Sequence, residues 1–182
     1  MNVVITDIPD VLVFEPQVFG DHRGYFLETW RADTYAAAGI DLPFVQDNQS
    51  SSGRGVLRGL HYQIRRPQGK LVRVLSGRVF DVAVDLRRAS PTFGRWTGVE
   101  LSAENHRQFW VPPGFGHGFY VLSDGAEFAY KCTDYYAPEH ERVIRWDDPA
   151  IGIAWPLVAG VSTVLSDKDR GGVDFAAAEV FP

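Results

Sequence analysis

Hydrophobic and polar positions alternate most clearly over residues 79–86, where every second residue is large and apolar. These residues are Phe80, Val82, Val84 and Leu86. A period of two is typical of a β-strand that is half-buried, with one face in the core. An apolar run at 71–75 precedes this segment, and the Ser76-Gly77 pair between them is typical of a tight turn. The pattern therefore predicts a β-hairpin over residues 71–86.

The same criteria predict many more short strands and very little helix. Further strands are expected at 11–14, 25–29, 44–47, 98–101, 107–111, 118–122, 126–134 and 143–146. Residues 32–38 are rich in Ala and are followed by Gly39, a typical helix end, so one helix is expected there. A second short helix is expected after Asp174. The chain contains no internal repeat, low-complexity segment or linker-like change in composition.

The 18 glycines and 11 prolines fall at short intervals between the apolar runs, which favours many short strands joined by turns. We therefore expect residues 1–182 to form a single all-β domain. A jelly-roll barrel, or double-stranded β-helix, is the expected architecture because it protects strand edges in a domain of this size. Residues 147–170 are expected to wrap back over the barrel as loops and short turns.

Composition and charge exclude several classes of protein. Eighteen basic and 23 acidic residues give a formal net charge of −5, which argues against nucleic-acid binding because that needs a concentrated basic face. A single cysteine, Cys132, allows no intramolecular disulfide, and the chain is predicted to be cytoplasmic. The N-terminal segment carries Asp7, Pro9 and Asp10 within its apolar stretch, so a signal peptide is not expected. No apolar run is long enough to predict a membrane span.

The segment VLRGLHYQ at residues 56–63 is the first candidate for a functional site. Arg58 and His61 lie among apolar residues such as Leu57 and Leu60, and a buried cation needs a partner or a function. In a regular strand these two side chains would face opposite sides. They share one site only if Gly59 introduces a kink or bulge. The alternative is that His61 is a hydrogen-bonded core residue without a chemical role.

Four other segments carry polar groups, each with a simple structural explanation. Residues 21–24 (DHRG) have the form of a solvated turn, and residues 165–169 (LSDKD) that of an exposed acidic turn. Residues 130–136 (YKCTDYY) place three tyrosines in a strand, and such aromatic strands more often pack in a core than act as acids. Residues 110–119 form a Pro- and Gly-rich bend that carries His117 and fixes it at low entropic cost.

The histidines argue against a metal site. A metal-binding barrel needs clustered ligands, such as a His-x-His pair followed by a carboxylate and a further His. The five histidines of this chain are isolated instead, at positions His22, His61, His106, His117 and His140. The chain also contains no nucleophile-elbow, P-loop or dinucleotide-binding motif. We therefore expect no metal ion and no cofactor.

Ten segments, in order and across nearly the whole chain, resemble the dTDP-4-dehydrorhamnose 3,5-epimerase family. They are FGDHRGYFLE (19–28), FVQDNQS (44–50), VLRGLHYQ (56–63), QGKLVRV (68–74), GRVFDVAVDLR (77–87), SPTFG (90–94), LSAENHRQFWVPPGFGHGF (101–119), YKCTDYYAPEHE (130–141), WDDPAIGIAWP (146–156) and LSDKD (165–169). The resemblance implies a metal-free, cupin-like jelly roll, usually a homodimer that exchanges strands. It also implies a dTDP-4-keto-6-deoxy sugar as substrate, inverted at C3 and C5.

The resemblance also implies roles for individual residues. His61 matches the base that removes the sugar protons, Asp169 the carboxylate that orients it, and Tyr130 the acid on the opposite face of the ring. Arg58 and Lys70 match groups around the C4 oxygen of the sugar. Arg23 and Lys168 match groups near the diphosphate. Other polar groups that position nucleotide or sugar are Glu28, Gln46, Asp47, Asn48, His117 and Glu141.

Three alternatives remain open at the level of the sequence. A mono-epimerase acting at C3 or C5 alone, in a secondary-metabolite pathway, would use the same base and acid. A non-catalytic barrel that binds sugar nucleotides would keep the binding residues, although the presence of His61, Tyr130 and Asp169 argues against it. A metal-dependent cupin oxygenase would need the ligand cluster that the sequence lacks.

Overall fold

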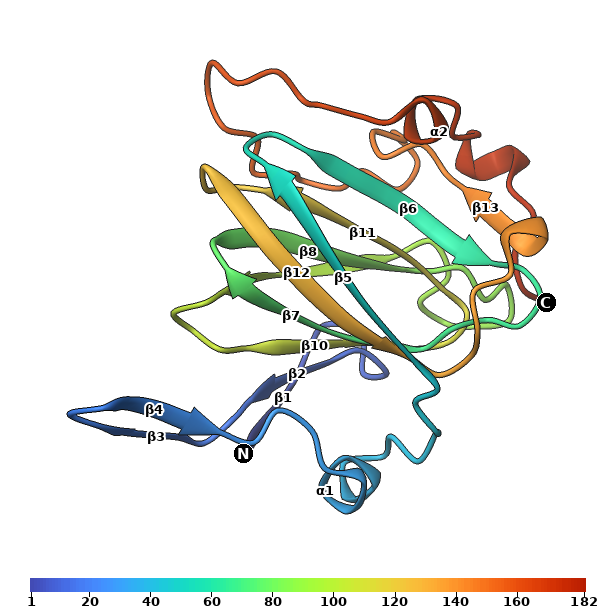
Figure 1. The fold of residues 1–182 in the computed structure, drawn as a ribbon. Coiled ribbons are helices and arrows are strands. Elements are labelled where there is room, and N and C mark those ends of the chain that lie inside the picture. The colour runs from blue at the N-terminus through green and yellow to red at the C-terminus, as the bar shows by residue number, and fades with distance from the viewer.

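The computed structural model describes residues 1–182 and contains thirteen β-strands with only short helices (Figure 1). The strands are β1 (Asn2–Ile5), β2 (Leu12–Glu15), β3 (Val18–Asp21), β4 (Gly24–Leu27), β5 (Gln46–Gly53), β6 (Leu57–Gln63), β7 (Lys70–Ser76), β8 (Arg78–Asp85), β9 (Trp96–Ser102), β10 (Gln108–Val111), β11 (Phe115–Val121), β12 (Gly125–Cys132) and β13 (Glu141–Val143). The helices are α1 (Ala32–Ala37) and α2 (Asp167–Arg170), with 3₁₀ turns η1 (Pro138–His140) and η2 (Phe175–Ala177). The all-β expectation is therefore confirmed.

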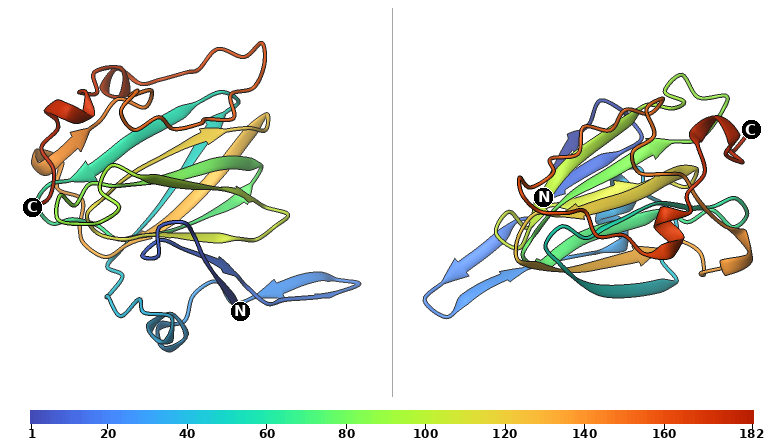
Figure 2. Two further views of the ribbon diagram at one scale, coloured as in Figure 1. Left: turned by 180° about the vertical axis from the view of Figure 1, so that it is seen from behind. Right: turned by 90° about the horizontal axis from the view of Figure 1, so that it is seen from above.

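Two antiparallel sheets face each other (Figures 1 and 2). The larger sheet has the strand order β1-β2-β10-β7-β12-β5, and the smaller one has the order β13-β6-β11-β8-β9. The main apolar cluster lies between them and includes Val72, Phe109, Phe119 and Phe128. This sandwich leaves one end of the inter-sheet space to polar side chains, and the candidate site lies there.

The prediction that residues 71–86 form a hairpin is wrong. β7 pairs with β10 and β12 in the larger sheet, whereas β8 pairs with β9 and β11 in the smaller one. The turn at Gly77 therefore carries the chain from one sheet to the other. Gly77 has φ +77°, and a Cβ there would meet the Gly125 carbonyl oxygen at 2.0 Å, so the crossing requires glycine. A tight-turn signal does not distinguish pairing strands from strands in facing sheets.

Strand β8 is buried on both faces and not half-buried as its alternation indicated. Val79 and Ala83 pack into the cluster between the sheets. Val82, Val84 and Leu86 pack on the other side, against a second apolar cluster that includes residues of the C-terminal segment. That segment crosses the outer face of the smaller sheet (Figure 2). The expectation that residues 147–170 wrap back over the barrel is confirmed, and this covering buries the second face.

Several strands differ from expectation at their boundaries or were not expected. β1, β3 and β6 lie outside the predicted strands, and the predicted strand at 44–47 shares only two residues with β5. β5 has the sequence QDNQSSSG, whose side chains face solvent or a polar cavity, so hydrophobic periodicity gives no signal there. The predicted strand at 143–146 overlaps β13 only at Val143. The helix at 32–38 and the turn after Asp174 are present as α1 and η2.

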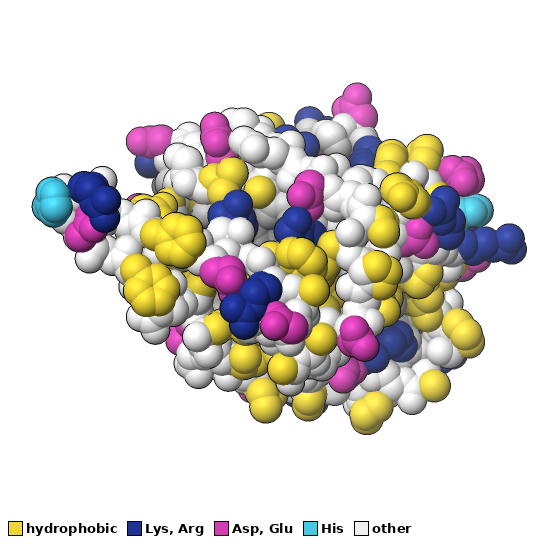
Figure 3. Space-filling view, turned by 60° about the horizontal axis from the view of Figure 1, so that its bottom comes forward, with side chains coloured by type: hydrophobic (Ala, Val, Ile, Leu, Met, Phe, Trp, Pro, Cys, Tyr) yellow, Lys and Arg dark blue, Asp and Glu magenta, His cyan; other side chains and the backbone are white.

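A two-stranded hairpin, β3–β4, projects away from both sheets (Figure 1). It carries Phe19, Tyr25 and Phe26, with 60%, 63% and 69% of their surface exposed. Figure 3 shows apolar side chains grouped beside charged ones on this side of the molecule. α1 packs nearby, through Tyr35, on the outer face of the larger sheet. None of the helices has the length and apolar character needed to span a membrane.

Candidate active site

A cavity of about 310 Å³ opens at the polar end of the space between the two sheets. Strands β5, β6, β7, β11 and β12 contribute to its wall, together with residues near β13 and α2. Most of the side chains singled out from the sequence line it. These are Gln46, Asn48, Arg58, His61, Lys70, His117, Tyr130, Glu141 and Lys168.

His61 forms the most distinctive contact of this cavity. Its Nε2 lies 2.5 Å from Oδ1 of Asp169, a residue with only 3% of its surface exposed. Donation of the Nε2 proton to the carboxylate leaves the lone pair on Nδ1, the form in which histidine acts as a base. Burial lowers the pKa of His61, and the nearby Asp169 carboxylate opposes this. The ring is therefore not enclosed in the apolar core but lines the cavity.

The backbone at Gly59 explains how Arg58 and His61 reach the same cavity. Gly59 has φ +138°, and the pairing of β6 with β11 shifts register opposite this position. A Cβ on Gly59 would meet the Gly118 Cα at 2.6 Å, so only glycine fits. The irregularity turns both side chains to one side, which is the condition for Arg58 and His61 to share one site. Arg58 is exposed at the rim, and its Nε donates to the Ser52 hydroxyl at 3.1 Å.

Asp169 reaches His61 because residues 165–169 are not the exposed acidic turn that their sequence indicated. Ser166 caps the short helix α2, and Asp169 in its first turn is directed inward and buried. Hydrogen bonds from His61 and Ser166 outweigh burial and hold the pKa of Asp169 at about 2. Asp167 is fully exposed. Lys168 donates to Glu141 at 2.9 Å across the mouth of the cavity.

Tyr130 and Lys70 line the same cavity from β12 and β7, strands of the larger sheet. Burial raises the pKa of the Tyr130 phenol, which keeps it protonated and able to donate. Burial lowers the pKa of the Lys70 ammonium, against the opposing effect of Cys132, Asp81 and Glu141. His61 faces them from β6 in the smaller sheet. A ligand between the sheets would therefore contact a base on one side and a phenol on the other.

His117 lies deeper and is held by a second carboxylate. Its Nε2 is 2.9 Å from Oδ1 of Asp81, and both side chains are buried. Burial raises the pKa of Asp81, partly offset by His117 and Lys70. The other oxygen of Asp81, Oδ2, is buried without a hydrogen-bond partner. The group around Lys70 therefore contains two carboxylates, Asp81 and Glu141, that favour its charged form.

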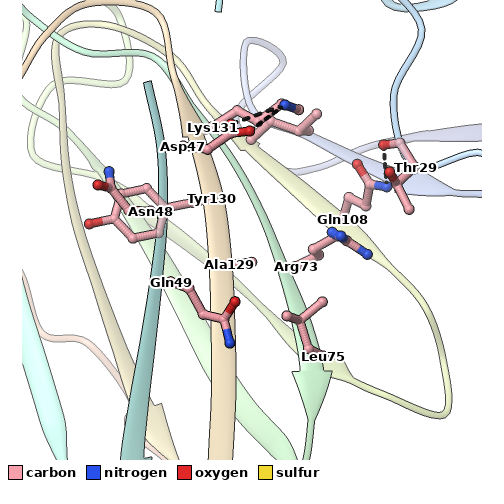
Figure 4. Close-up of a pocket in the computed structure, with 11 residues that line it drawn as sticks. Thr29, Asp47, Asn48, Gln49, Arg73, Leu75, Gln108, Ala129, Tyr130 and Lys131 are labelled. Carbon is pink, nitrogen blue, oxygen red and sulfur yellow. Dashed lines mark hydrogen bonds and ion pairs between the residues drawn. The ribbon is translucent and has the colours of Figure 1, made fainter. Parts of the chain in front are cut away.

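Four of the predicted site residues do not line this cavity: Asp169, which contacts it only through His61, and three that lie elsewhere. Arg23 is at the tip of the β3–β4 hairpin, where it pairs with Asp21 at 2.6 Å and its side chain is 79% exposed. Glu28 follows the hairpin and lies 3.6 Å from Arg31. Asp47 points to the opposite face of the larger sheet and binds Lys131 at 3.0 Å (Figure 4). In this structure the hairpin projects away from the two sheets, and Arg23 does not line the cavity that contains His61.

Several lining residues were not singled out from the sequence. They are Ser50, Gln68, Phe119, Phe128 and Tyr136. Ser50 follows Gln46 and Asn48 at a spacing of two, so a strand assignment for this polar segment would have included it. The Tyr136 hydroxyl donates to Glu141 at 3.2 Å, and its backbone N–H donates to the Gln46 side chain. The run of three tyrosines gave no signal to separate Tyr136 from its neighbours.

The outer face of the larger sheet carries a second, wider cavity of about 430 Å³ (Figure 4). Gln49, Arg73, Leu75 and Gln108 line it, and it shares Asn48 and Tyr130 with the first cavity. It contains neither His61 nor Asp169. We will call it the outer cavity. Nowhere does the structure bring three His, Cys, Asp or Glu side chains together in a way suited to a metal ion.

Comparison with known proteins gives one consistent result. The family model described as dTDP-4-dehydrorhamnose 3,5-epimerase matches residues 5–177. A protein of that description from Pseudomonas aeruginosa is 62% identical over 176 residues, which cover 96% of each chain. The structure is similar, with a TM-score of 0.95 and 54% identity, to a Legionella pneumophila epimerase in complex with dTDP-4-keto-L-rhamnose, over 98% of this chain and 94% of that one. These structural relatives confirm the jelly-roll expectation.

A more distant similarity bears on the choice between one and two inverted centres. A 3′-monoepimerase from Streptomyces bikiniensis, solved in complex with dTDP-quinovose, has a TM-score of 0.88 and 38% identity over 94% of this chain and 87% of that one. The same architecture therefore occurs in a protein that inverts a single centre. Identity to the 3,5-epimerases above is higher, at 62% and 54%.

Proposed function

This chain belongs to the dTDP-4-dehydrorhamnose 3,5-epimerase family, and we propose that it converts dTDP-4-dehydro-6-deoxy-D-glucose to dTDP-4-dehydro-L-rhamnose through residues of the inter-sheet cavity. The observation that carries the proposal is the His61–Asp169 pair, which faces Tyr130 and Lys70 across that cavity. A base, an acid and a cation are the groups that inversion next to a ketone requires.

His61 is the base of the proposed reaction. The C4 ketone acidifies the protons at C3 and C5, so that Nδ1 of a neutral imidazole removes one of them and an enolate forms. The imidazolium that results is stabilised by Asp169, as in other His–Asp pairs. Asp169 keeps its charge because its pKa is about 2.

Tyr130 is the acid that completes each inversion. Its phenol delivers a proton to the enolate carbon from the face opposite His61, and the C–H bond re-forms with inverted configuration. The phenolate then takes a proton from solvent, and the imidazolium of His61 gives up its proton to solvent, so that both groups return to their starting states. The phenol suits donation because burial raises its pKa and disfavours the phenolate before reaction.

Lys70 and Arg58 stabilise the enolate oxygen. Negative charge develops at O4 of the sugar only after proton removal, so a cation there favours the transition state over the bound substrate. Lys70 is placed inside the cavity and Arg58 at its rim. The carboxylates Asp81 and Glu141 favour the charged ammonium, which its burial opposes.

We assign the nucleotide to the mouth of the cavity. Lys168 is a cation for the diphosphate, and Gln46, Asn48, His117 and Glu141 provide hydrogen bonds for sugar or base. This accounts for an acidic protein that binds a diphosphate through a few placed cations. Neither a metal ion nor a cofactor takes part in the proposed steps, and a cytoplasmic location remains a prediction from the sequence.

We propose further that the protein acts as a homodimer in which each β3–β4 hairpin crosses to the other copy. The exposed Phe19, Tyr25 and Phe26 give the hairpin an apolar surface, and the outer cavity gives the partner sheet a recess. Arg23 and Glu28 would then serve the site of the partner copy. This reconciles their expected roles with their distance from the cavity of their own chain.

The decisive experiment is proton exchange in deuterated water with dTDP-4-keto-6-deoxyglucose. We expect the wild-type protein to incorporate deuterium at both C3 and C5, and His61→Ala to lower exchange by about 10²- to 10⁴-fold. Nucleotide affinity, measured by calorimetry with dTDP, should stay nearly unchanged in this variant because the imidazole contacts the sugar ring.

The other candidate functions give different outcomes in the same experiment. Deuterium at only one carbon would identify a mono-epimerase, the activity of the similar Streptomyces bikiniensis protein. Binding of dTDP without exchange at either carbon would identify a non-catalytic sugar-nucleotide barrel and contradict the proposed reaction. Exchange in His61→Ala at the wild-type rate would show that another group is the base.

A further inference from the structure

Ser166 makes two hydrogen bonds to the same residue, Asp169. Its hydroxyl accepts the Asp169 backbone N–H at 3.1 Å as the cap of α2, and donates its own proton to Oδ2 of Asp169 at 2.6 Å. A cap normally satisfies only the backbone N–H group. The second bond ties the start of α2 to a carboxylate whose other oxygen contacts His61.

The three hydrogen bonds to Asp169 divide its two oxygens between two tasks. Oδ1 accepts from His61 Nε2 at 2.5 Å and from the Gly59 backbone N–H at 3.4 Å. Oδ2 accepts from Ser166 only. Without that hydroxyl no hydrogen bond within the structure holds Oδ2, and only the two bonds to Oδ1 oppose rotation of the carboxylate about its Cβ–Cγ bond. Ser166 is not among the residues that line the cavity, so it has no direct path to the sugar.

From this geometry we propose that Ser166 is a positioning residue, whose hydroxyl fixes the rotation of the Asp169 carboxylate so that Oδ1 stays aligned with His61. The expected effect on catalysis rests on the proposed function, because it requires that His61 is the base. A base–carboxylate pair depends on orientation to within a fraction of an ångström, and misplacement is costly in rate.

The charged groups around His61 determine the direction in which its pKa should change when the Ser166 hydroxyl is lost. Asp169 raises the pKa of His61, whereas burial lowers it, and the cations Lys168 and Lys70 lower it as well. The other titratable and charged groups that line the cavity are Arg58, His117, Tyr130, Tyr136 and Glu141. If the carboxylate rotates away, the stabilising contact weakens while burial and the cations remain. Loss of the Ser166 hydroxyl should therefore lower the pKa of His61 further.

The test replaces Ser166 with Ala, Gly and Thr and follows His61 by proton NMR titration in the substrate-free protein, with His61→Asn to identify its signal. Ser166→Ala and Ser166→Gly should lower the pKa of His61, move the acid limb of kcat/KM to lower pH, and reduce kcat about tenfold with little change in KM. Gly is tolerated at a helix cap almost as well as Ser, so the second variant separates capping from positioning.

Two further variants complete the design. Ser166→Thr keeps the hydroxyl, and the exposed position of Ser166 leaves room for the extra methyl group, so wild-type behaviour should return. Ser90→Ala is the matched control, since Ser90 donates to the buried Asp85 at the same 2.6 Å, outside the cavity. It should affect stability alone and leave the His61 pKa and kcat unchanged.

An unchanged His61 pKa in both Ser166→Ala and Ser166→Gly would overturn the proposal, as would an equal loss of kcat in Ser166→Thr. So would a shift of the His61 pKa that leaves kcat at the wild-type value. Because the titration needs no substrate, failure of the proposed reaction is a separate result: the unmodified protein would then show no proton exchange.

Discussion

At the scale of single residues, the chemistry depends on opposing effects on each titratable group. Burial lowers the pKa of His61, and the Asp169 carboxylate raises it. Burial is the larger effect. The pKa of the Asp169 carboxyl is also lowered, to about 2, but there burial would raise it and the hydrogen bonds from His61 and Ser166 outweigh burial. The pair therefore holds a neutral imidazole next to an ionised carboxylate at neutral pH, which is the state a base requires.

The pH dependence of the reaction follows from this state. His61 must be unprotonated to remove a proton, and its pKa lies below the ordinary value of 6.5, so the midpoint of the acid limb of kcat/KM should lie below pH 6.5. A profile of kcat/KM between about pH 4.5 and 9 measures this limb. An acid limb centred above pH 6.5 would contradict the assigned balance between burial and the carboxylate.

Tyr130→Phe separates proton removal from inversion. The variant keeps the ring but lacks the proton that the phenol would deliver, so exchange should continue through His61 while net inversion falls by about 10²-fold or more. Product stereochemistry by NMR, compared with deuterium content, measures the two steps separately. If the stereochemical outcome equals that of the wild type, the acid on the opposite face has been misassigned.

At the scale of elements, β6 shows how a strand irregularity makes a site. Its departure from regular pairing at Gly59 turns Arg58 and His61 into one cavity, and the neighbouring Gly118 backbone fills the space that a side chain would need. The regular pairing of the strand is therefore interrupted at the point where Arg58 and His61 enter the cavity.

Gly59→Ala should be strongly disruptive. The φ of +138° and the 2.6 Å approach of the new Cβ to the Gly118 Cα should cost about 2 kcal/mol or more and displace His61, so that Tm and kcat fall together. Gly53→Ala, at the end of β5, is the control, because a Cβ there meets nothing within 4 Å. Thermal unfolding and exchange rates measure both variants. Wild-type activity in Gly59→Ala would show that the irregularity is not needed.

Elements with a hydrophobic period were predictable, and those shaped by polar contacts were not. Strands such as β8 and β12 were located from apolar residues, whereas β5 has no such pattern because it faces water and the cavity. The pairing partners of β7 and β8 were also predicted wrongly. A turn signal between two strands does not specify which sheet each strand joins. Strand identity is a local property, but sheet membership depends on distant parts of the chain.

The residues of the candidate site were predictable to different extents for the same reason. Arg58 and His61 stood out from the sequence as polar residues in an apolar segment, and the need for a kink at Gly59 followed from strand periodicity. Asp169 did not stand out, because residues 165–169 have the composition of an exposed turn and only tertiary packing buries that side chain. Its assignment came from the family resemblance.

At the scale of the whole molecule, the projecting hairpin and the outer cavity argue for two copies acting together. Mixing tests this directly, using a variant defective in the hairpin, Arg23→Ala with Glu28→Ala, and a variant defective in the base, His61→Ala. Each alone should be weakly active. In a mixed dimer one of the two sites combines an intact base with an intact hairpin, so an equal mixture should recover about a quarter of wild-type activity.

The mixture is measured after joint refolding, with oligomeric state followed by light scattering. A mixture no more active than the sum of its parts would contradict exchange of the hairpin between copies. So would a monomeric mass at the concentration at which the enzyme is active. Phe26→Asp tests the apolar contact and should shift the protein toward monomer.

The bond between His61 and Asp169 joins positions 108 residues apart, and the parallel bridge between Val56 and Val164 brings the two segments together. The barrel core needs no such closure, because its strands pair among themselves. Orientation of His61 therefore depends on a segment that returns to β6 from 108 residues further along the chain. A copy with both sheets formed but residues 165–169 displaced would keep most of the cavity wall and lose the carboxylate that orients His61.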